Sequence, residues 1–283
     1  MEVETPLLAR CGTTDPALES FAVPYQDGSQ RFLQTSPEAA MKRLLAAGSG
    51  DIYQIAHAFR REEQSRLHLE EFSLVEWYRV GFDHHRLMDD VEGLLRAAGF
   101  MHEIKRDSYA ALCERFVGLN PHTASTAVLA EYAGQRGARF SATDCDDRAM
   151  LLDLLFGCGV LPQLRAAGAL LIHDFPREHA AYAKLTHTMP PVAERFELLI
   201  DGVEIANGFH EVTAPDEQAA RHARENQLRQ IRGLSEMAID SALLAALDAG
   251  LPPCAGVAVG LDRLLMALES SADIVNVVAF GHG

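Results

Sequence analysis

Charged residues inside an apolar strand–loop–strand stretch, residues 59–79, most constrain what this chain can fold into. The stretch reads FRREEQSRLHLEEFSLVEWYR and ends in an alternating run. Because side chains two apart in a strand share a face, Glu76 and Tyr78 point the same way. By the same rule, Arg60 and Glu62 share a face of the first strand. A buried charge is costly unless it is paired. The stretch therefore predicts a hairpin that binds an anion through Arg60 and a cation through Glu76, with an internally salt-bridged hairpin as the alternative.

Length and composition indicate an ordinary globular protein. The chain has 283 residues, of which 48% are hydrophobic and 23% charged, enough for one large core or two modest ones. No apolar run approaches the roughly 18 residues of a membrane span, and the N-terminal MEVETP lacks the features of a signal peptide. The five cysteines form no CxxC pair, so we expect free thiols in a reducing cytoplasm.

The net charge bears on the choice of partner. Lysine and arginine total 25 against 40 acidic residues, which leaves a net charge of −15. Nucleic-acid binding depends on basic side chains that neutralise phosphates. The charge balance therefore argues against tRNA as the partner of this chain.

The clearest turn signal is Asp201-Gly202, which lies between two apolar runs and predicts a tight β-hairpin. A two-residue turn pairs Leu199 with Glu204, and it pairs Glu197 with Ala206. Glu197 and Glu204 then share a face as diagonal neighbours, roughly 7–8 Å apart at their Cβ atoms. Two carboxylates at this spacing can flank Mg²⁺. A pair of acids on one face without a cation is hard to explain by stability.

Other segments are assigned by periodicity and capping signals. Ser36 is a good N-cap, Pro37 fits the first position of a helix that runs to about Ala47, and Glu38 suits its first turn. Further helices are expected, and so are a core strand at 170–175 and a strand-to-helix junction at 254–263. The expected helices are 84–98, 108–117, 124–136, 146–156 and 215–232, the last with a polarity typical of a solvated surface.

Three motifs occur in an order that resembles one known family. The run F-R-x-E, a loop with a histidine, and E-F-x-x-x-E-W-Y are similar to motif 2 of the class II aminoacyl-tRNA synthetases, in their lysyl branch. The block F-E-x-x-x-x-G-x-E-I-A-N-G-F-H-E resembles the lysyl-specific part, and G-x-x-x-G-x-D-R resembles motif 3. The resemblance covers essentially the whole chain. It implies an α+β fold, with an antiparallel β-sheet flanked by helices, in a single catalytic domain at 1–283 with a helical insertion at about 84–165.

The resemblance also implies a nucleotide site. Arg60 would hold the ATP α-phosphate and the substrate carboxylate, Glu62 the adenine amino group, and Arg263 the γ-phosphate. Phe72 would stack on the adenine, and His68 would reach the phosphates. Leu198 and Gly260 would also line the ATP site, and Glu197 and Glu204 would hold Mg²⁺ there. Where the family usually has His-Asn-Pro-Glu-Phe, this chain has His68-Leu69-Glu70-Glu71-Phe72, a departure at its second and third residues.

A lysine-like substrate is implied by the same motifs. The residues assigned to it are Ser36, Pro37 and Glu38 at the α-amino group, Glu76, Tyr78 and Glu211 toward the side-chain ammonium, Asn207 at the carboxylate, and Glu204 and Ala258 elsewhere in the site. Ala258 stands where lysyl-tRNA synthetases usually have glycine. Its extra methyl group would crowd an α-amino acid and tolerate β-lysine.

The chemistry implied is adenylation, in which the amino-acid carboxylate attacks the α-phosphate of ATP and pyrophosphate leaves. No anticodon-binding barrel precedes Glu2, so the expected acceptor is a lysine of a protein, elongation factor P, and tRNA is unlikely. The alternatives are a stand-alone or truncated lysyl-tRNA synthetase-like enzyme and a non-catalytic paralogue that only binds. The long helix of motif 1 is expected to be missing, which leaves open whether a homodimer forms.

Overall fold

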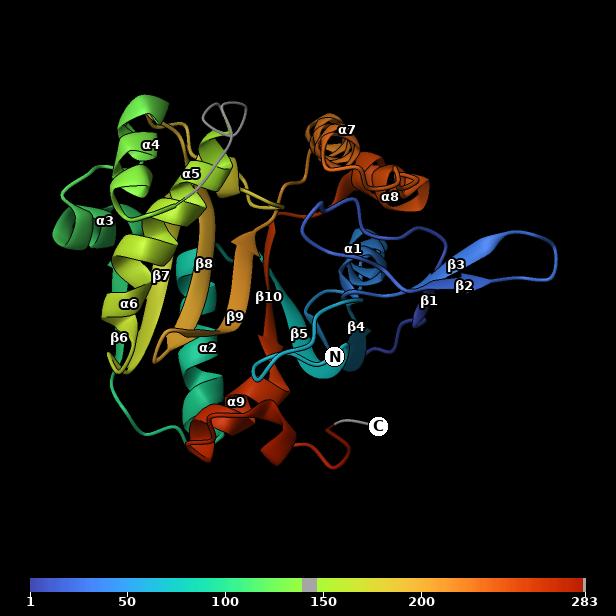
Figure 1. Cartoon of the computed structure of the whole chain (residues 1–283). Coiled ribbons are helices and arrows are strands. Elements are labelled where there is room, and N and C mark those ends of the chain that lie inside the picture. The colour runs from blue at the N-terminus through green and yellow to red at the C-terminus, as the bar shows by residue number, and fades with distance from the viewer. Residues whose placement is uncertain (139–146, 282–283) are drawn as a thin grey trace. The chain divides into compact units, whose positions relative to one another are not determined.

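The computed structural model describes residues 1–138 and 147–281 and divides the chain into two compact units. The first unit comprises residues 1–82 and 211–283, and the second comprises residues 83–210. Strands in both are mainly antiparallel and have helices against them (Figure 1), so the predicted α+β class is confirmed.

The central strand of the first unit is β5, Glu71–Val80, which pairs antiparallel with β4, Ile52–Phe59, and with β10, Cys254–Gly260. A small antiparallel sheet has the order β1-β3-β2. Its strands are β1 Leu8–Ala9, β2 Ala22–Pro24 and β3 Gln30–Leu33, and the helices are α1 Glu38–Ala46, α7 Pro215–Ile231, α8 Ser241–Gly250, α9 Leu261–Leu268 and the 3-10 helix η4 Ile274–Asn276. Helices α1 and α8 pack together over an apolar cluster.

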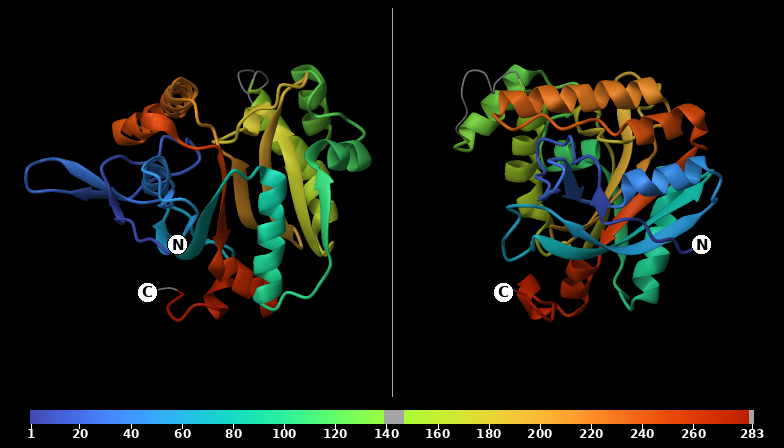
Figure 2. Two further views of the ribbon diagram at one scale, coloured as in Figure 1. Left: turned by 180° about the vertical axis from the view of Figure 1, so that it is seen from behind. Right: turned by 90° about the vertical axis from the view of Figure 1, so that its right-hand side faces the viewer.

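The second unit contains the consecutive antiparallel strands β7, β8 and β9, and β6 joins β7 in parallel. Figures 1 and 2 together show α2 on the face of these strands opposite α5 and α6. The strands are β6 Ile104–Ser108, β7 Ala169–Pro176, β8 Val192–Ile200 and β9 Val203–His210. The helices are α2 His84–Ala97, α3 Tyr109–Val117, α4 Thr126–Gln135, α5 Arg148–Leu155, the π-helix η2 Phe156–Val160, α6 Leu161–Leu164 and the 3-10 helix η3 Arg177–His179.

Most predicted elements are confirmed within a few residues at each end. The helices expected at 84–98, 108–117, 124–136 and 146–156 correspond to α2, α3, α4 and α5, although residue 146 lies outside the described part of the chain. The expected core strand at 170–175 is β7. Strand β6, its parallel pairing with β7, and the short helices η2 and α6 were not predicted. Among the residues that the structure describes, no helix is both long and apolar enough to cross a bilayer.

The first strand of the motif 2 hairpin was predicted wrongly. Strand β4 ends at Phe59, so Arg60 and Glu62 lie in the loop that leads to β5. The Arg61 amide donates to the carbonyl of Glu19 at 2.8 Å, which draws the chain away from β5. Glu62 has a φ of 65°, in the left-handed region that ends an extended strand.

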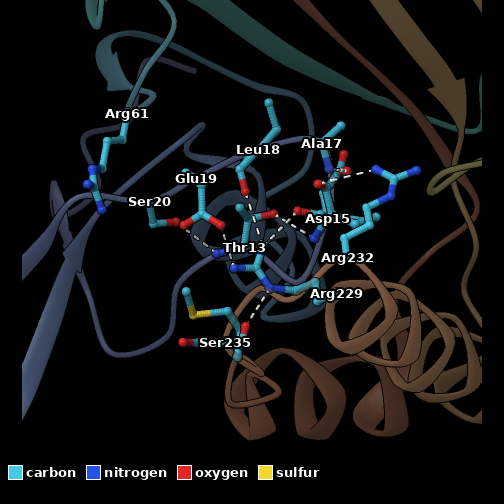
Figure 3. A network of polar contacts seen from close by, with 12 residues as sticks. Thr13, Asp15, Ala17, Leu18, Glu19, Ser20, Arg61, Arg229, Arg232 and Ser235 are labelled. Atoms are coloured by element: carbon cyan, nitrogen blue, oxygen red, sulfur yellow. Dashed lines mark hydrogen bonds and ion pairs between the residues drawn. The ribbon is translucent and has the colours of Figure 1, made fainter.

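The expected solvated polar surface of the helix at 215–232 is confirmed on one side, where Arg224, Gln227 and Gln230 are exposed, but a buried polar face was not predicted. Helix α7 buries four polar side chains on one face, at the helical spacing of residues 218, 222, 226 and 229. Arg229 is completely buried. It donates to the carbonyls of Ser235, Asp15 and Leu18 at 2.7, 3.1 and 3.2 Å and to the carboxylate of Glu19 at 2.8 Å (Figure 3). The buried polar face of α7 therefore has a structural role, because its hydrogen bonds hold the loop at 13–20.

Candidate active site

The candidate site is centred on one face of strands β5 and β10, where alternate side chains of β5 point the same way. Glu76 is paired with Ala258 of β10, and Tyr78 is paired with Gly256. Because directly paired residues share a face of the sheet, the four positions form one patch. Phe72 lies farther along the same face, since it is an even number of residues from Glu76.

Four charged groups are gathered around this patch. The Tyr78 hydroxyl donates to the Glu76 carboxylate at 2.8 Å. The Lys42 ammonium, on α1, lies 2.5 Å from the Glu38 carboxylate and 2.7 Å from the Glu211 carboxylate. Glu76 and Glu211 are 3% and 1% exposed, so both carboxylates are out of contact with bulk water. Two carboxylates thus contact the ammonium group, and the third, that of Glu76, lies near enough for their charges to influence each other.

Burial changes the protonation of these acids. Burial raises the pKa of Glu76 to about 8, and the nearby Glu38 carboxylate adds to the rise. Burial also raises the pKa of Glu211, while Lys42 opposes that rise. Burial would lower the pKa of Lys42, but the carboxylates of Glu211 and Glu38 outweigh it and hold the ammonium charged. An excess of buried carboxylates is unfavourable, and a cation beside them would offset that cost.

At Gly256, beside this patch, the structure leaves no room for a side chain. A Cβ on Gly256 would lie 2.3 Å from Cε1 of Tyr78 and 2.7 Å from Oε1 of Glu211. Glycine here therefore allows the phenol ring and the carboxylate to approach β10. Two residues along the same strand face, Ala258 carries a methyl group opposite Glu76.

The start of α1 brings Glu38 to this cluster. The Ser36 hydroxyl accepts from the Glu38 amide at 3.3 Å, and Pro37 is the N-cap residue, so the helix begins one residue later than predicted. Glu38 lies in the first turn, with Lys42 one turn after it.

Arg60 is placed for an anionic ligand. Its guanidinium lies 5.0 Å from the centroid of the Phe72 ring, and one nitrogen is 3.8 Å from the Glu63 carboxylate. Its Nε is buried and has no hydrogen-bond partner within the part of the chain that the structure describes. A buried donor without an acceptor is unfavourable, and a carboxylate or phosphate oxygen would satisfy it.

Motif 3 holds the loop that follows Arg60. The Asp262 carboxylate at the start of α9 accepts from the Ser73 amide at 2.7 Å. The Nε of Arg263 donates to the carbonyl of Leu67 at 3.0 Å. Gly260 is the residue before α9, so β10 delivers the strand-to-helix junction that the sequence predicts.

Two other predicted nucleotide contacts lie in this loop. The Glu62 side chain is 70% exposed and lies 3.3 Å from the Arg61 guanidinium. The ring of His68 is 2.8 Å from the Ser65 hydroxyl. These contacts do not test the adenine and phosphate roles of Glu62 and His68, which stay predictions.

The acid pair lies on β8 and β9 of the second unit. The predicted pairing of Glu197 with Ala206 was wrong, because the register shifts between Leu198 and Leu199 and Glu197 lies opposite Asn207. The predicted pairing of Leu199 with Glu204 is confirmed. Burial raises the pKa of Glu197, a neighbouring arginine opposes the rise, and the Glu204 carboxylate adds to it. The two acids therefore influence each other despite the bulge.

Arg195 lies beside one member of this pair, Glu197, and the sequence reasoning missed it. It donates to Glu197, to Oδ1 of Asn207 at 3.1 Å and to the carbonyl of His179 at 2.8 Å. A signal was present, since Arg195 is two residues before Glu197 and so shares its strand face. Leu198 is fully buried in the core and can offer a nucleotide only its backbone.

Lys42 was missed in the same way. It follows Glu38 by four residues, and side chains at this spacing are neighbours on a helix. Such a pair is common on exposed helix faces, so the sequence alone does not mark it as part of a site. Its burial beside Glu211 distinguishes it.

The chain was compared with known proteins. A family model for class II tRNA synthetases (D, K and N) matches residues 1–283. A Vibrio cholerae protein named elongation factor P–(R)-β-lysine ligase is 44% identical over 285 residues, which cover 99% of this chain and 88% of the relative. Proteins of the same name from Mannheimia succiniciproducens and Yersinia enterocolitica are 43% and 41% identical, over 99% and 100% of this chain and 88% and 89% of the relatives.

Proposed function

The chain belongs to the class II tRNA synthetase family, and from this premise we propose that it is an ATP-dependent ligase that activates (R)-β-lysine, or lysine, and transfers it to a lysine side chain of elongation factor P. The names of the relatives at 41–44% identity support this assignment. The free thiols of the four described cysteines fit a reducing cytoplasm as the location.

The observation that carries the proposal is the excess of buried carboxylate beside Lys42. Lysine and β-lysine each bring two ammonium groups and one carboxylate. Glu76 and Glu211, each almost fully buried, supply acceptors for ammonium groups. The unpartnered Nε of Arg60 supplies a donor for an anionic oxygen. The site thus offers negative groups for the two ammonium groups of a diamino acid and a positive group for its carboxylate.

The reaction follows from this arrangement. The carboxylate of the amino acid attacks the α-phosphorus of ATP, pyrophosphate leaves, and an aminoacyl-adenylate forms. Arg60 and Arg263 stabilise the negative charge that develops on phosphate oxygens, and positioning with charge neutralisation is what such a step requires. The ε-amine of the acceptor lysine then attacks the acyl carbon, and AMP leaves.

Glu197 and Glu204 would hold Mg²⁺. Burial and the nearby Glu204 carboxylate raise the pKa of Glu197, a cost that a bound cation would offset, and oxygen ligands suit this metal. When bound, Mg²⁺ neutralises charge on the triphosphate. If this assignment is right, Glu204→Gln raises the Mg²⁺ concentration needed for half-maximal activity, and an unchanged requirement would contradict it.

Two assays test the function as a whole. Amino-acid-dependent exchange of pyrophosphate into ATP, with (R)-β-lysine and with L-lysine, measures activation. Transfer is then measured by the mass increase of elongation factor P and by charging of tRNA. We expect modification of the protein and negligible charging of tRNA, in line with the net charge of −15. Efficient tRNA charging would favour a stand-alone lysyl-tRNA synthetase-like enzyme, and absence of any exchange would favour a non-catalytic paralogue.

A further inference from the structure

A cluster of imidazoles in the second unit takes no part in the proposed reaction. His84 and His85 open helix α2, directly after the N-cap residue Asp83. His173 and Asp174 lie on β7. Four side chains that can bind a metal ion thus come from two elements that are far apart in the sequence.

The distances within this cluster are short. Nε2 of His84 is 3.1 Å from Oδ1 of Asp174, and Nδ1 of His173 is 2.9 Å from Oδ2 of the same carboxylate. The rings of His84 and His85 are 4.0 Å apart at their centroids, and those of His85 and His173 are 5.1 Å apart. One ligand atom from each of His84, His85 and Asp174 lies within 4.8 Å of the other two. Small side-chain rotations would bring them to a common ion.

The backbone of β7 is distorted at the cluster. Asp174 has a φ of 58°, in the left-handed region, and the register with β8 shifts between His173 and Phe175. A bulge of this kind re-aims a side chain, and non-glycine residues adopt the unfavourable left-handed conformation where the surroundings require it. The bulge directs the Asp174 carboxylate to the two histidines instead of leaving it in the regular strand alternation.

A purely structural role would be a hydrogen bond that joins α2 to β7 through His84 and Asp174. That role leaves two observations unexplained. Nδ1 of His84 is buried without a hydrogen-bond partner among the described residues. His85 is exposed, and within the described ranges its ring contacts the other two imidazoles and has no hydrogen bond. An imidazole kept beside two others without a hydrogen bond is arranged as a ligand would be.

The donor set of the cluster suits a transition ion. Neutral imidazole with a carboxylate favours zinc and its neighbours among divalent metals over Mg²⁺ or Ca²⁺. The positive end of the helix dipole at the N-terminus of α2 would repel a cation. The negative charges of the Asp83 and Asp174 carboxylates offset that repulsion.

We propose that His84, His85 and Asp174 form a binding site for a divalent transition ion of the zinc type, with His173 orienting the Asp174 carboxylate. A ligating group that is hydrogen-bonded by a neighbour is the usual arrangement at metal sites. The site is separate from the Mg²⁺ ligands proposed above, since it uses other residues and a different ligand chemistry.

The test is calorimetric titration of the full chain with ZnCl₂ after removal of metals by a chelator, in excess Mg²⁺ so that carboxylate sites are filled. Co²⁺, whose visible absorption reports nitrogen ligation, serves as a second probe. His85→Ala removes an exposed ligand and leaves the His84–Asp174 hydrogen bond in place. His187→Ala, which alters an exposed histidine of the same unit outside the cluster, is the matched control. Circular dichroism checks that each variant is folded.

We expect the wild type and His187→Ala to bind one equivalent of Zn²⁺ alike, and His85→Ala to bind at least about tenfold more weakly, the smaller of the losses seen when the surroundings of a metal site are altered. Asp174→Asn should weaken binding as well. The proposal is overturned if the wild type binds no stoichiometric Zn²⁺, or if His85→Ala binds it as tightly as the wild type does.

Discussion

Two buried clusters of charged side chains in the first unit differ in how well their charges are balanced. Each of the three nitrogens of the Arg229 guanidinium donates a hydrogen bond. The four acceptors are three backbone carbonyls and the carboxylate of Glu19. The cluster around Lys42 has three acidic groups for one ammonium group, and among the described residues Glu76 has one hydrogen-bond partner, the Tyr78 hydroxyl. A satisfied buried charge stabilises one conformation, whereas an unbalanced one marks where a ligand binds.

The largest expected effect is the loss of the satisfied cluster. Arg229→Met leaves the half-buried Glu19 carboxylate and three carbonyls without their donor, so we expect the free energy of unfolding to fall by about 3–5 kcal/mol. The midpoint of urea unfolding measures it. Arg232→Met is the control, because Arg232 is exposed and makes one long hydrogen bond, 3.4 Å, to the carbonyl of Pro16. A midpoint for Arg229→Met equal to that of the control would show that the network does not hold the loop.

The next effect concerns the arginine with an unpartnered donor. Arg60→Ala and Arg263→Ala should each slow pyrophosphate exchange by about 10²–10³-fold, the usual loss for one preorganised donor. Arg61→Ala is the neighbouring control, since its side chain is 56% exposed and paired only with Glu62. If Arg60→Ala instead lowers stability and leaves exchange per folded molecule unchanged, Arg60 belongs with Arg229 as a structural residue.

A smaller effect is expected in the unbalanced cluster. Glu76→Gln keeps an acceptor for Tyr78 but removes a charge, and a hydrogen bond to a charged group contributes about 1.5–3 kcal/mol. The KM for the amino acid should therefore rise by about 10–150-fold. Glu71→Gln, at an exposed position of the same strand, should leave KM unchanged. An unchanged KM in Glu76→Gln would remove this residue from the binding site.

The pH dependence sharpens the same prediction. The folded-state pKa of Glu76 is raised from 4.5 to about 8, so folding favours the protonated acid. This contribution to stability is complete below pH 4.5 and is lost as the pH rises through about 8. The ligand-free protein should lose stability across that window, while KM for the amino acid falls as Glu76 ionises. Both slopes should flatten in Glu76→Gln, and slopes that persist would assign the titration to another group.

The smallest effect rests on one methyl group. Ala258 lies opposite Glu76 on the site face, and a group of this size discriminates between substrates by about 1–3 kcal/mol, or roughly 10–200-fold. We expect the wild type to prefer (R)-β-lysine and Ala258→Gly to gain activity with L-lysine in pyrophosphate exchange. Ala255→Gly removes the same methyl from the opposite face and is the control. A ratio of the two substrates that does not move in Ala258→Gly would show that Ala258 is not the selector.

Local pattern was sufficient for the parts of the site that lie on regular elements. The alternation of β5 predicted that Glu76 and Tyr78 share a face, and their hydrogen bond confirms it. The Asp201-Gly202 turn predicted the β8–β9 hairpin. Both predictions rest on the two-residue period of a strand and on the few residues that a tight turn tolerates.

Only the tertiary structure decided which charges are paired. Arg229 is bonded to the carbonyl of Asp15, 214 residues away, and Lys42 is bonded to Glu211 across most of the chain. The turn that takes Arg60 out of the strand is likewise accompanied by a contact with a distant segment, the bridge between Arg61 and Glu19. Periodicity shows which face a side chain occupies, but whether a polar side chain on that face is solvated, paired or left for a ligand depends on what the rest of the chain packs against it.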